Sequence, residues 1–397
     1  MRLLKFSIEN YKSYKEKQEV LFCENEKNTT AFFGPNSSGK SNFFSALNFF
    51  CDFILHSTDF HRTKVLANDF FRLSDDGKKR ETSFCAEFKN QNYQYEYCFS
   101  ITRDGNVADE RLRRKKTDSS NNYKTVFSRG SIINNRYNNY DFTPRLLNET
   151  RSDSLVLTRA YSANNSIAKD VFSCIESIML ISGSKINVKY TGYTAEMVSE
   201  RPERKSEVLR FLKLADLYIQ DFSVEKDDRI EKMDSSMFSP AMTEMLRRAS
   251  YKVATSHALR DNNGNVIGLT NMSMYEDESA GTNQLFEYAS LILEALKEGK
   301  ILYIDELEIN LHPRECAFIV NLFNDNYKEN TANGQLIINT HETNLIDLLG
   351  KDNCYFLGKD KFESTIIKKL SGIRSDEKNL AKKYNAGLYG AVPQIGL

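Results

Sequence analysis

Near its N-terminus the sequence reads Gly34-Pro35-Asn36-Ser37-Ser38-Gly39-Lys40-Ser41, followed by Asn42. This run matches G-x-x-x-x-G-K-[ST], the pattern of a loop whose backbone N–H groups bind phosphate. Apolar residues 31–33 precede the loop, and a helical pattern of apolar residues follows it over 43–50. In that order of strand, loop and helix, the N–H groups of the loop and of the first helical turn converge on phosphate oxygens. The sequence therefore predicts an ATP or GTP site, with a chance Gly-Lys-Ser turn as the alternative.

A pair of carboxylates lies more than 230 residues further along, in Ile301-Leu302-Tyr303-Ile304-Asp305-Glu306. Phosphoryl transfer requires positioning and charge stabilisation more than covalent help. We expect Lys40 to contact the β- and γ-phosphates, and Ser41 with Asp305 to hold Mg²⁺, partly through water. Glu306 is then placed to orient or deprotonate the attacking water. The alternative for Asp305 and Glu306 is a simple strand-end helix cap.

Two further segments lie on either side of the Asp305–Glu306 pair in the sequence. Ser279, Ala280, Gly281 and Thr282 precede an amphipathic helical pattern, so this turn is a second candidate anion site built from free N–H groups at a helix start. Taken alone, it is explained by a helix cap. His341 ends another apolar strand pattern, residues 335–340, where a sensor of the γ-phosphate would lie.

Composition narrows the class of protein. The chain has 397 residues, of which 40% are hydrophobic and 27% charged, as is ordinary for a soluble globular protein. The 54 basic residues balance the 54 acidic ones, so a global attraction to nucleic acid is absent. No apolar run reaches the roughly 20 residues that span a bilayer, and no signal peptide begins the chain, which predicts a cytoplasmic protein. The seven cysteines are scattered without a C-x-x-C pair, so we expect reduced thiols and no zinc.

The order of patterns suggests three segments along the chain. Residues 1–102 and 251–397 read as the two halves of one α/β nucleotide-binding unit with a mixed sheet, and residues 83–101 alternate as an antiparallel pair of strands. Residues 103–250 read as a compact, mainly helical insertion, whose polar, Asn-rich part (103–153) we expect to be irregular. A hairpin turn is expected at 261–265. The insertion is expected either to contact a partner or to form a plain lid.

One dense basic run lies within this insertion and contains Arg111, Arg113, Arg114, Lys115 and Lys116. Such a run could contact nucleic acid or an acidic protein. A solvated loop or strand edge is the more common explanation.

Taken together, the motifs resemble those of ABC-type ATPases of the SMC-like group, and more closely those of the AAA family fifteen ATPases found beside bacterial abortive-infection and phage-defence genes. The similarity lies in residues 4–14 (LKFSIENYKSY), in residues 306–313 (ELEINLHP) and in the C-terminal residues 383–393. It covers both ends and the region around Ser279, and much less of the middle. Lys12 and Glu308 depart from the Arg and Asp that are usual in the family.

The resemblance implies roles for individual residues. Ser279, Ala280, Gly281 and Thr282 would contact the γ-phosphate held by the P-loop of a partner protomer, as a signature motif acting in trans. His341 would sense that phosphate within its own chain, and Glu308 and Asn310 would form the D-loop at the dimer seam. It also implies ATP rather than GTP, a homodimer that is compatible with larger rings, and slow hydrolysis. Neither Gln91 nor Gln94 can be assigned as the Q-loop glutamine.

Three functional hypotheses follow from the sequence. The first is an ATP-driven sensor and scaffold of an anti-phage or toxin–antitoxin system, triggered by a phage protein or nucleic acid and controlling a separately encoded nuclease or toxin. The second is a stand-alone nuclease, against which the lack of a second carboxylate cluster after His341 argues. The third is a DNA-repair ATPase that acts on ends, which the neutral charge and the absence of long heptad repeats disfavour.

Overall fold

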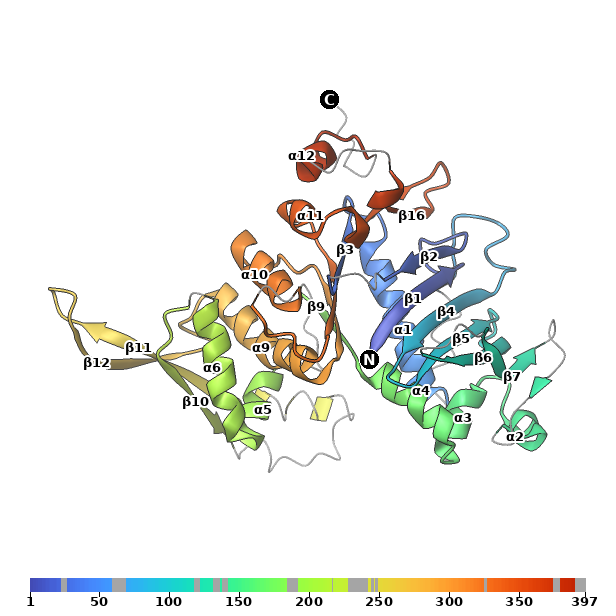
Figure 1. Cartoon of the computed structure of the whole chain (residues 1–397), viewed down its shortest axis with the longest axis horizontal. Helices are drawn as coiled ribbons and strands as arrows, with labels where there is room; N and C mark the ends of the chain where they lie inside the picture. The colour runs from blue at the N-terminus through green and yellow to red at the C-terminus, as the bar shows by residue number, and fades with distance from the viewer. Residues whose placement is uncertain are drawn as a thin grey trace.

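The computed structural model contains two large sheets and a projecting three-stranded sheet (Figure 1). The described residues are 1–22, 27–58, 69–117, 122–130, 136–137, 142–183, 192–215, 217–227, 242–243, 246, 249–324, 327–373 and 379–389. Within these residues no helix has the length and apolar character needed to cross a membrane.

The central sheet has six strands in the order β16-β15-β3-β14-β13-β9. Its strands are β3 (Thr29–Phe33), β9 (Ile178–Ser182), β13 (Ile301–Asp305), β14 (Gln335–Asn339), β15 (Cys354–Lys359) and β16 (Thr365–Lys369). All neighbours pair in parallel except β15 and β16. Every residue of β3, β13 and β14 is buried, as is typical of parallel strands covered on both faces.

The second sheet is antiparallel, with seven strands in the order β2-β1-β4-β5-β6-β7-β8. Its strands are β1 (Arg2–Glu9), β2 (Gln18–Leu21), β4 (Thr82–Lys89), β5 (Tyr93–Ile101), β6 (Val107–Lys116), β7 (Lys124–Gly130) and β8 (Arg136–Tyr137). Its inner face packs aromatic rings onto helix α1 (Lys40–His56). For example, the rings of Phe50 and Phe99 stack with their centroids 5.4 Å apart.

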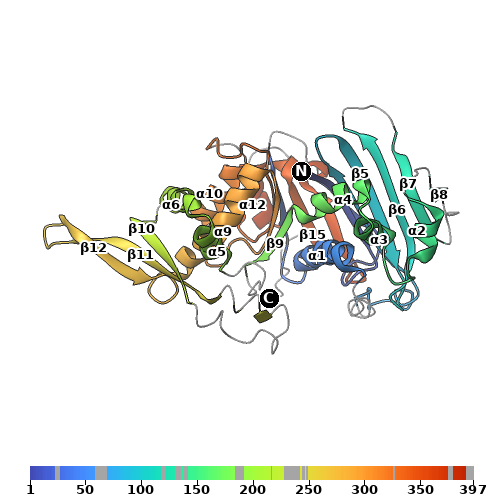
Figure 2. The ribbon, with the colours of Figure 1, turned by 90° about the horizontal axis from the view of Figure 1, so that it is seen from below.

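Alternation of side chains gives the central sheet two hydrophobic cores. On one face Phe32, Tyr303 and Ile337 pack toward α1 and the antiparallel sheet, together with α3 (Val156–Ser162) and α4 (Ser166–Glu176). On the other face Ile304 and Ile338 pack toward a second layer of helices. That layer includes α5 (Tyr193–Glu200), α6 (Lys205–Leu214), α9 (Ala280–Glu298), α10 (Pro313–Phe323), α11 (Asn344–Leu349) and α12 (Leu380–Asn385). The short helix α2 (Pro144–Glu149) lies beside the antiparallel sheet (Figure 2).

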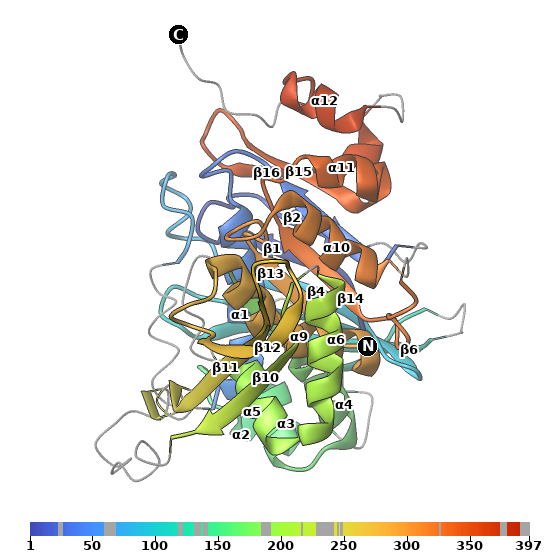
Figure 3. The ribbon, with the colours of Figure 1, turned by 90° about the vertical axis from the view of Figure 1, so that its left-hand side faces the viewer.

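A three-stranded sheet projects from the helical side of the molecule (Figures 1 and 3). Its strands are β10 (Asp221–Lys226), β11 (Tyr251–Arg260) and β12 (Val266–Ser273), in that order. The turn between β11 and β12 lies at residues 261–265, where Asp261 accepts the N–H groups of Asn263 and Asn265, so the predicted hairpin is confirmed.

The segment 103–153 differs from the irregular structure expected from its polar composition. Residues 107–116 and 124–130 form β6 and β7, which extend the antiparallel sheet. Val107, Leu112, Val126 and Phe127 face its core. Glu110 is also buried there and accepts the Tyr97 hydroxyl at 2.8 Å, whereas Arg111 and Arg113 occupy the outer face. Four asparagines that motivated the expectation (134, 135, 138 and 139) and Asn121 lie outside the described residues.

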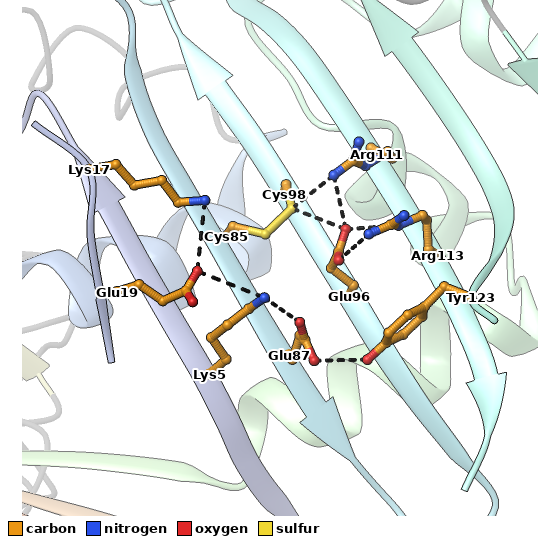
Figure 4. The surroundings of a disulfide bond; sticks show 10 residues. All are labelled: Lys5, Lys17, Glu19, Cys85, Glu87, Glu96, Cys98, Arg111, Arg113 and Tyr123. Carbon is orange, nitrogen blue, oxygen red and sulfur yellow. Dashed lines mark hydrogen bonds and ion pairs between the residues drawn. A yellow bond between two sulfur atoms is a disulfide. The ribbon is translucent and has the colours of Figure 1, made fainter. Parts of the chain in front are cut away.

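The outer face of the antiparallel sheet also corrects the expectation for the cysteines (Figure 4). Cys85 and Cys98 face each other in the β4–β5 register and form a disulfide, which the sequence alone gave no reason to expect. Beside them, Glu96 accepts hydrogen bonds from Arg111 and Arg113. Two members of the basic run are therefore ion-paired on a strand. Cys51, Cys174, Cys316 and Cys354 are buried and take no part in a disulfide, and Cys23 lies outside the described residues.

Candidate nucleotide site

The predicted site residues follow neighbouring parallel strands. The P-loop (34–39) follows β3, and His341 follows β14. Asp305 is the last residue of β13, and Glu306 follows it. Because β3, β14 and β13 are adjacent and parallel, their carboxyl ends meet at one edge of the sheet. Ligands of open α/β sheets bind at that edge. The fold thus brings together residues that are more than 230 positions apart in the sequence.

The P-loop has the tight backbone that its glycines permit. Gly39 has a φ of 112°, and a Cβ at this position would collide with the side chain of Thr365 on β16. Thr365 Oγ1 in turn donates to Ser38 O at 2.8 Å, and Tyr14 donates its hydroxyl to Gly39 O at 2.9 Å. Ser38 Oγ is buried and has no hydrogen-bond partner among the described residues. The loop is therefore fixed from outside by residues that the sequence motif does not contain.

Lys40 begins α1 and is folded back over the loop. Its Nζ donates to Gly34 O at 2.7 Å and to Pro35 O at 3.2 Å. Burial lowers the pKa of Lys40 to about 8, and the nearby carboxylates of Glu308, Asp305 and Glu306 offset part of this effect. Among the described residues the Lys40 ammonium group donates only to backbone carbonyls, and such a buried cation is suited to an anionic ligand.

Ser41 and Asp305 supply the oxygens expected to hold a metal. The Ser41 hydroxyl lies 3.4 Å from Asp305 Oδ1, so a single cation can contact both oxygen atoms. Burial raises the pKa of Asp305, while hydrogen bonds from Asn339 and Ser41 oppose this. A buried carboxylate beside a hydroxyl is a donor set that fits Mg²⁺.

Asn339 and Tyr303 hold this carboxylate and were not identified from the sequence. Asn339 Nδ2 donates to Asp305 Oδ1 at 2.5 Å, and the Tyr303 hydroxyl donates to Asn339 Oδ1 at 2.9 Å. All three side chains are buried. The pairing of β13 with β14 brings them together, so only the strand register could have revealed the contact.

Glu306 lies at the surface end of β13 in an unusual backbone conformation. Its φ of 59° is in the left-handed region, which a non-glycine residue rarely adopts. Two hydrogen bonds hold the backbone around it, from Gly183 N–H to Asp305 O at 2.7 Å and from Leu307 N–H to Asn339 O at 3.1 Å. Such strained residues, when fixed by their surroundings, are common at functional sites.

His341 and Glu308 lie against each other in the same chain. The backbone N–H of His341 donates to Glu308 Oε1 at 3.0 Å. The other carboxylate oxygen, Glu308 Oε2, is buried without a hydrogen-bond partner among the described residues. Partial burial and the charge of Lys40 lower the pKa of His341, which favours the neutral imidazole. Lys40, Glu306, Glu308 and His341 thus influence one another electrostatically across the sheet edge.

The signature turn forms a separate half-site. Ser279 caps α9, since its Oγ accepts the N–H of Thr282 at 3.1 Å, and Ala280 is the first helical residue. A Cβ on Gly281 would lie 2.7 Å from Asn310 O, so this glycine lets the turn approach the loop that carries Asn310. In the described part of the chain, no hydrogen bond or ion pair joins residues 279–282 to residues 34–42. The cap interpretation is therefore correct within one chain, and the role in trans stays a prediction.

The glutamines considered for the Q-loop lie in the antiparallel sheet. Gln94 Nε2 donates to Glu87 Oε2 at 3.2 Å on the outer face, and Gln91 is exposed in the β4–β5 turn. Both behave as polar residues of a strand pair.

The chain is similar to one protein family and to several solved structures. The family described as "AAA domain, putative AbiEii toxin, Type IV TA system" matches residues 29–347, which is most of the chain. Among solved structures, the chain is similar to the SMC head domain from Thermotoga maritima (13% identity, TM-score 0.45, covering 94% of this chain and 100% of that one). It is also similar to an SmcHead bound to the C-winged helix domain of ScpA (13% identity, TM-score 0.47, covering 94% and 99%). No curated protein matches.

Proposed function

Because the chain belongs to the family described as "AAA domain, putative AbiEii toxin, Type IV TA system", we propose that it is an ATPase that acts as the sensor and scaffold of a bacterial anti-phage or toxin–antitoxin system. The observation that carries the ATPase part is the meeting of Lys40, Ser41 and Asp305 at one sheet edge, with Glu306 and His341 beside them. The system-level role rests on the family and on the resemblance of the sequence to ATPases of phage-defence operons.

In this proposal Lys40 exchanges its two carbonyl partners for β- and γ-phosphate oxygens. The loop N–H groups and the start of α1 bind the remaining phosphate oxygens. Ser41 and Asp305 would hold Mg²⁺, which supplies charge neutralisation on the phosphates. Asn339 and Tyr303 keep the Asp305 carboxylate oriented while this happens.

Glu306 is proposed as the general base. The water oxygen attacks the γ-phosphorus, the bond from that phosphorus to the β–γ bridging oxygen breaks, and the water proton passes to the Glu306 carboxylate. The products are ADP and phosphate. His341, which is held by Glu308, donates a ring N–H to a γ-phosphate oxygen and so distinguishes ATP from ADP.

The second half of the site is proposed to come from a partner protomer. The α9 N-terminus, with Ser279 and Gly281, would contribute N–H and hydroxyl donors to the γ-phosphate. Asn310 lies beside Gly281 and would line the seam. ATP then joins two chains, and hydrolysis separates them. A separately encoded nuclease or toxin would respond to this assembly, and a phage protein or nucleic acid would trigger it.

Phosphate release from MgATP tests the catalytic assignment directly. We expect Glu306→Gln to bind ATP as tightly as the wild type and to hydrolyse it about 10²–10⁴-fold more slowly. Hydrolysis by this variant at the wild-type rate would refute the assignment of the base.

The alternative function is a DNA-end or DNA-repair ATPase that acts with a partner nuclease. Incubation of the purified chain with linear DNA and MgATP separates the possibilities. If the chain is a sensor and scaffold, we expect no cleavage of the DNA and no stimulation of ATP hydrolysis by DNA ends. Cleavage would indicate a nuclease, and stimulation by ends would favour the repair function.

A further inference from the structure

The projecting hairpin carries exposed apolar side chains on its outer strand. Val266, Ile267 and Leu269 of β12 are each more than half exposed, and Leu259 on β11 lies beside them in the register. Scattered exposed apolar residues are ordinary, but several on one projecting hairpin indicate an interaction surface (Figures 1 and 2).

Strand β12 is also an edge strand. Among the described residues it pairs only with β11, because the sheet order is β10-β11-β12. Met274 N–H donates to Val253 O, and the antiparallel ladder alternates from that point. The N–H groups of Leu269, Asn271 and Ser273 therefore point away from β11. Ser273 N–H is bound by Asp277 at 2.7 Å, whereas the N–H groups of Leu269 and Asn271 have no partner in the described part of the chain.

Nothing in the composition of β12 protects this edge. Residues 262–275 contain no charged side chain and no proline. Proteins usually protect an exposed edge strand with charges, prolines or bulges, because its free backbone groups pair readily with another strand. Strand β12 has one register shift, between Val266 and Gly268. The part suited to strand pairing in an assembly is therefore the regular run 268–273, which has neither charges nor prolines.

We propose that β12 pairs antiparallel with β12 of a second copy of this chain. An uncharged strand can face itself without repulsion, and a two-fold axis beside it presents the same donors and acceptors from both copies. The apolar side chains of one strand then cover those of the other, and the free N–H groups of Leu269 and Asn271 find carbonyl partners.

This interface is distinct from the proposed ATP interface but lies next to it. At the base of the hairpin, Thr255 Oγ1 donates to Glu278 Oε1 at 2.5 Å, and His257 Nε2 lies 2.6 Å from the same oxygen. Glu278 immediately precedes Ser279. Two independent interfaces on one chain, one through β12 and one through ATP, generate assemblies larger than a dimer.

Light scattering without nucleotide tests β12 pairing separately from the ATPase proposal. We expect wild type to reach the mass of two chains as its concentration is raised over about a hundredfold range. Leu269→Lys, which places like charges across the axis, is expected to stay near the 45.7 kDa of one chain. Leu73→Lys is the matched control, since Leu73 is 62% exposed and Leu269 is 61% exposed, and it is expected to behave as wild type.

A second variant tests the backbone directly. Asn271→Pro removes one outward N–H without adding charge and is tolerated on an edge strand, so we expect it to shift the dimerisation midpoint to at least about tenfold higher concentration. Thermal unfolding and phosphate release, unchanged in both variants at low concentration, would show that the fold and the ATP site are intact. A wild-type chain that stays monomeric, or a Leu269→Lys variant that dimerises like wild type, would overturn the proposal. Dimers that form only with MgATP would also overturn β12 pairing, but they would agree with the ATPase proposal.

Discussion

The two halves of the proposed ATP site differ in how completely one chain builds them. The P-loop half is held by buried contacts from four strands, including the Tyr303–Asn339–Asp305 hydrogen bonds and the support of Thr365. The signature half is a capped helix start whose described contacts lie with its own first turn and with the Asn310 loop. The P-loop half is held in place by its own chain, so we expect it to bind nucleotide alone. The signature turn has no nucleotide site beside it in its own chain, so it needs the P-loop of a second copy.

The largest effect is expected from a change in the P-loop half. Lys40→Ala should weaken ATP binding at least about a hundredfold and bring hydrolysis to background, because the phosphates lose their buried cation. Equilibrium binding of a fluorescent ATP analogue measures this.

Lys27→Ala is the matched control. Lys27 also donates its Nζ to two backbone carbonyls, Leu348 O at 2.7 Å and Leu349 O at 3.0 Å, but lies away from the P-loop. Equal loss of binding in both variants would mean that Lys40 acts through the fold rather than through phosphate.

Mixing two inactive variants tests the difference between the halves. Lys40→Ala keeps its signature turn, and Ser279→Arg keeps its P-loop, so each mixed dimer has one complete site. An equimolar mixture should therefore recover about a quarter of wild-type hydrolysis, since half of the dimers are mixed and each has one working site of two.

The control mixture combines Lys40→Ala with Glu306→Gln. Both changes affect the same half-site, so no mixed dimer gains a complete site and hydrolysis should stay at background. Failure of the Ser279→Arg mixture to rise above this control would remove the proposed action in trans.

The Mg²⁺ requirement of hydrolysis tests whether the hydrogen bonds on Asp305 support metal binding in the P-loop half. Asn339→Leu removes the amide that orients Asp305, so the Mg²⁺ concentration for half-maximal hydrolysis should rise by about tenfold or more. Tyr303→Phe removes only the outer hydrogen bond and should have a smaller effect. An unchanged Mg²⁺ requirement in Asn339→Leu would show that this network serves packing alone.

The smallest effect is expected from the pH dependence of ATP affinity. With its pKa lowered to about 8, Lys40 is protonated below that pH and neutral above it in the free protein. Phosphate binding favours the charged form, so ATP affinity should be flat below about pH 8 and fall by up to about tenfold per unit above it. Isothermal titration across this range measures the slope. Lys40→Arg keeps the charge and should show a flatter profile; equal slopes would assign the proton to another group.

The sequence was informative where function lies in contiguous residues. The P-loop, the Asp305–Glu306 pair and His341 each end an apolar run, and parallel strands bring such ends to one edge. Asn339, Tyr303 and Thr365 were missed because their contacts depend on strand register across 34 or more positions. The β6–β7 strands were missed because β6 is mostly charged and one of its buried positions is Glu110, so Val107 and Leu112 show no apolar alternation in the sequence. The Cys85–Cys98 pairing likewise depends on the β4–β5 register.

ATP is proposed to join the P-loop half-site of one chain to the signature half-site of another. Light scattering of Glu306→Gln with and without MgATP tests this most directly, because this variant should keep ATP bound without hydrolysing it. We expect MgATP to at least double the mass found without nucleotide, and we expect the further change Ser279→Arg to abolish this increase. A mass that MgATP leaves unchanged, with ATP bound, would contradict the proposal.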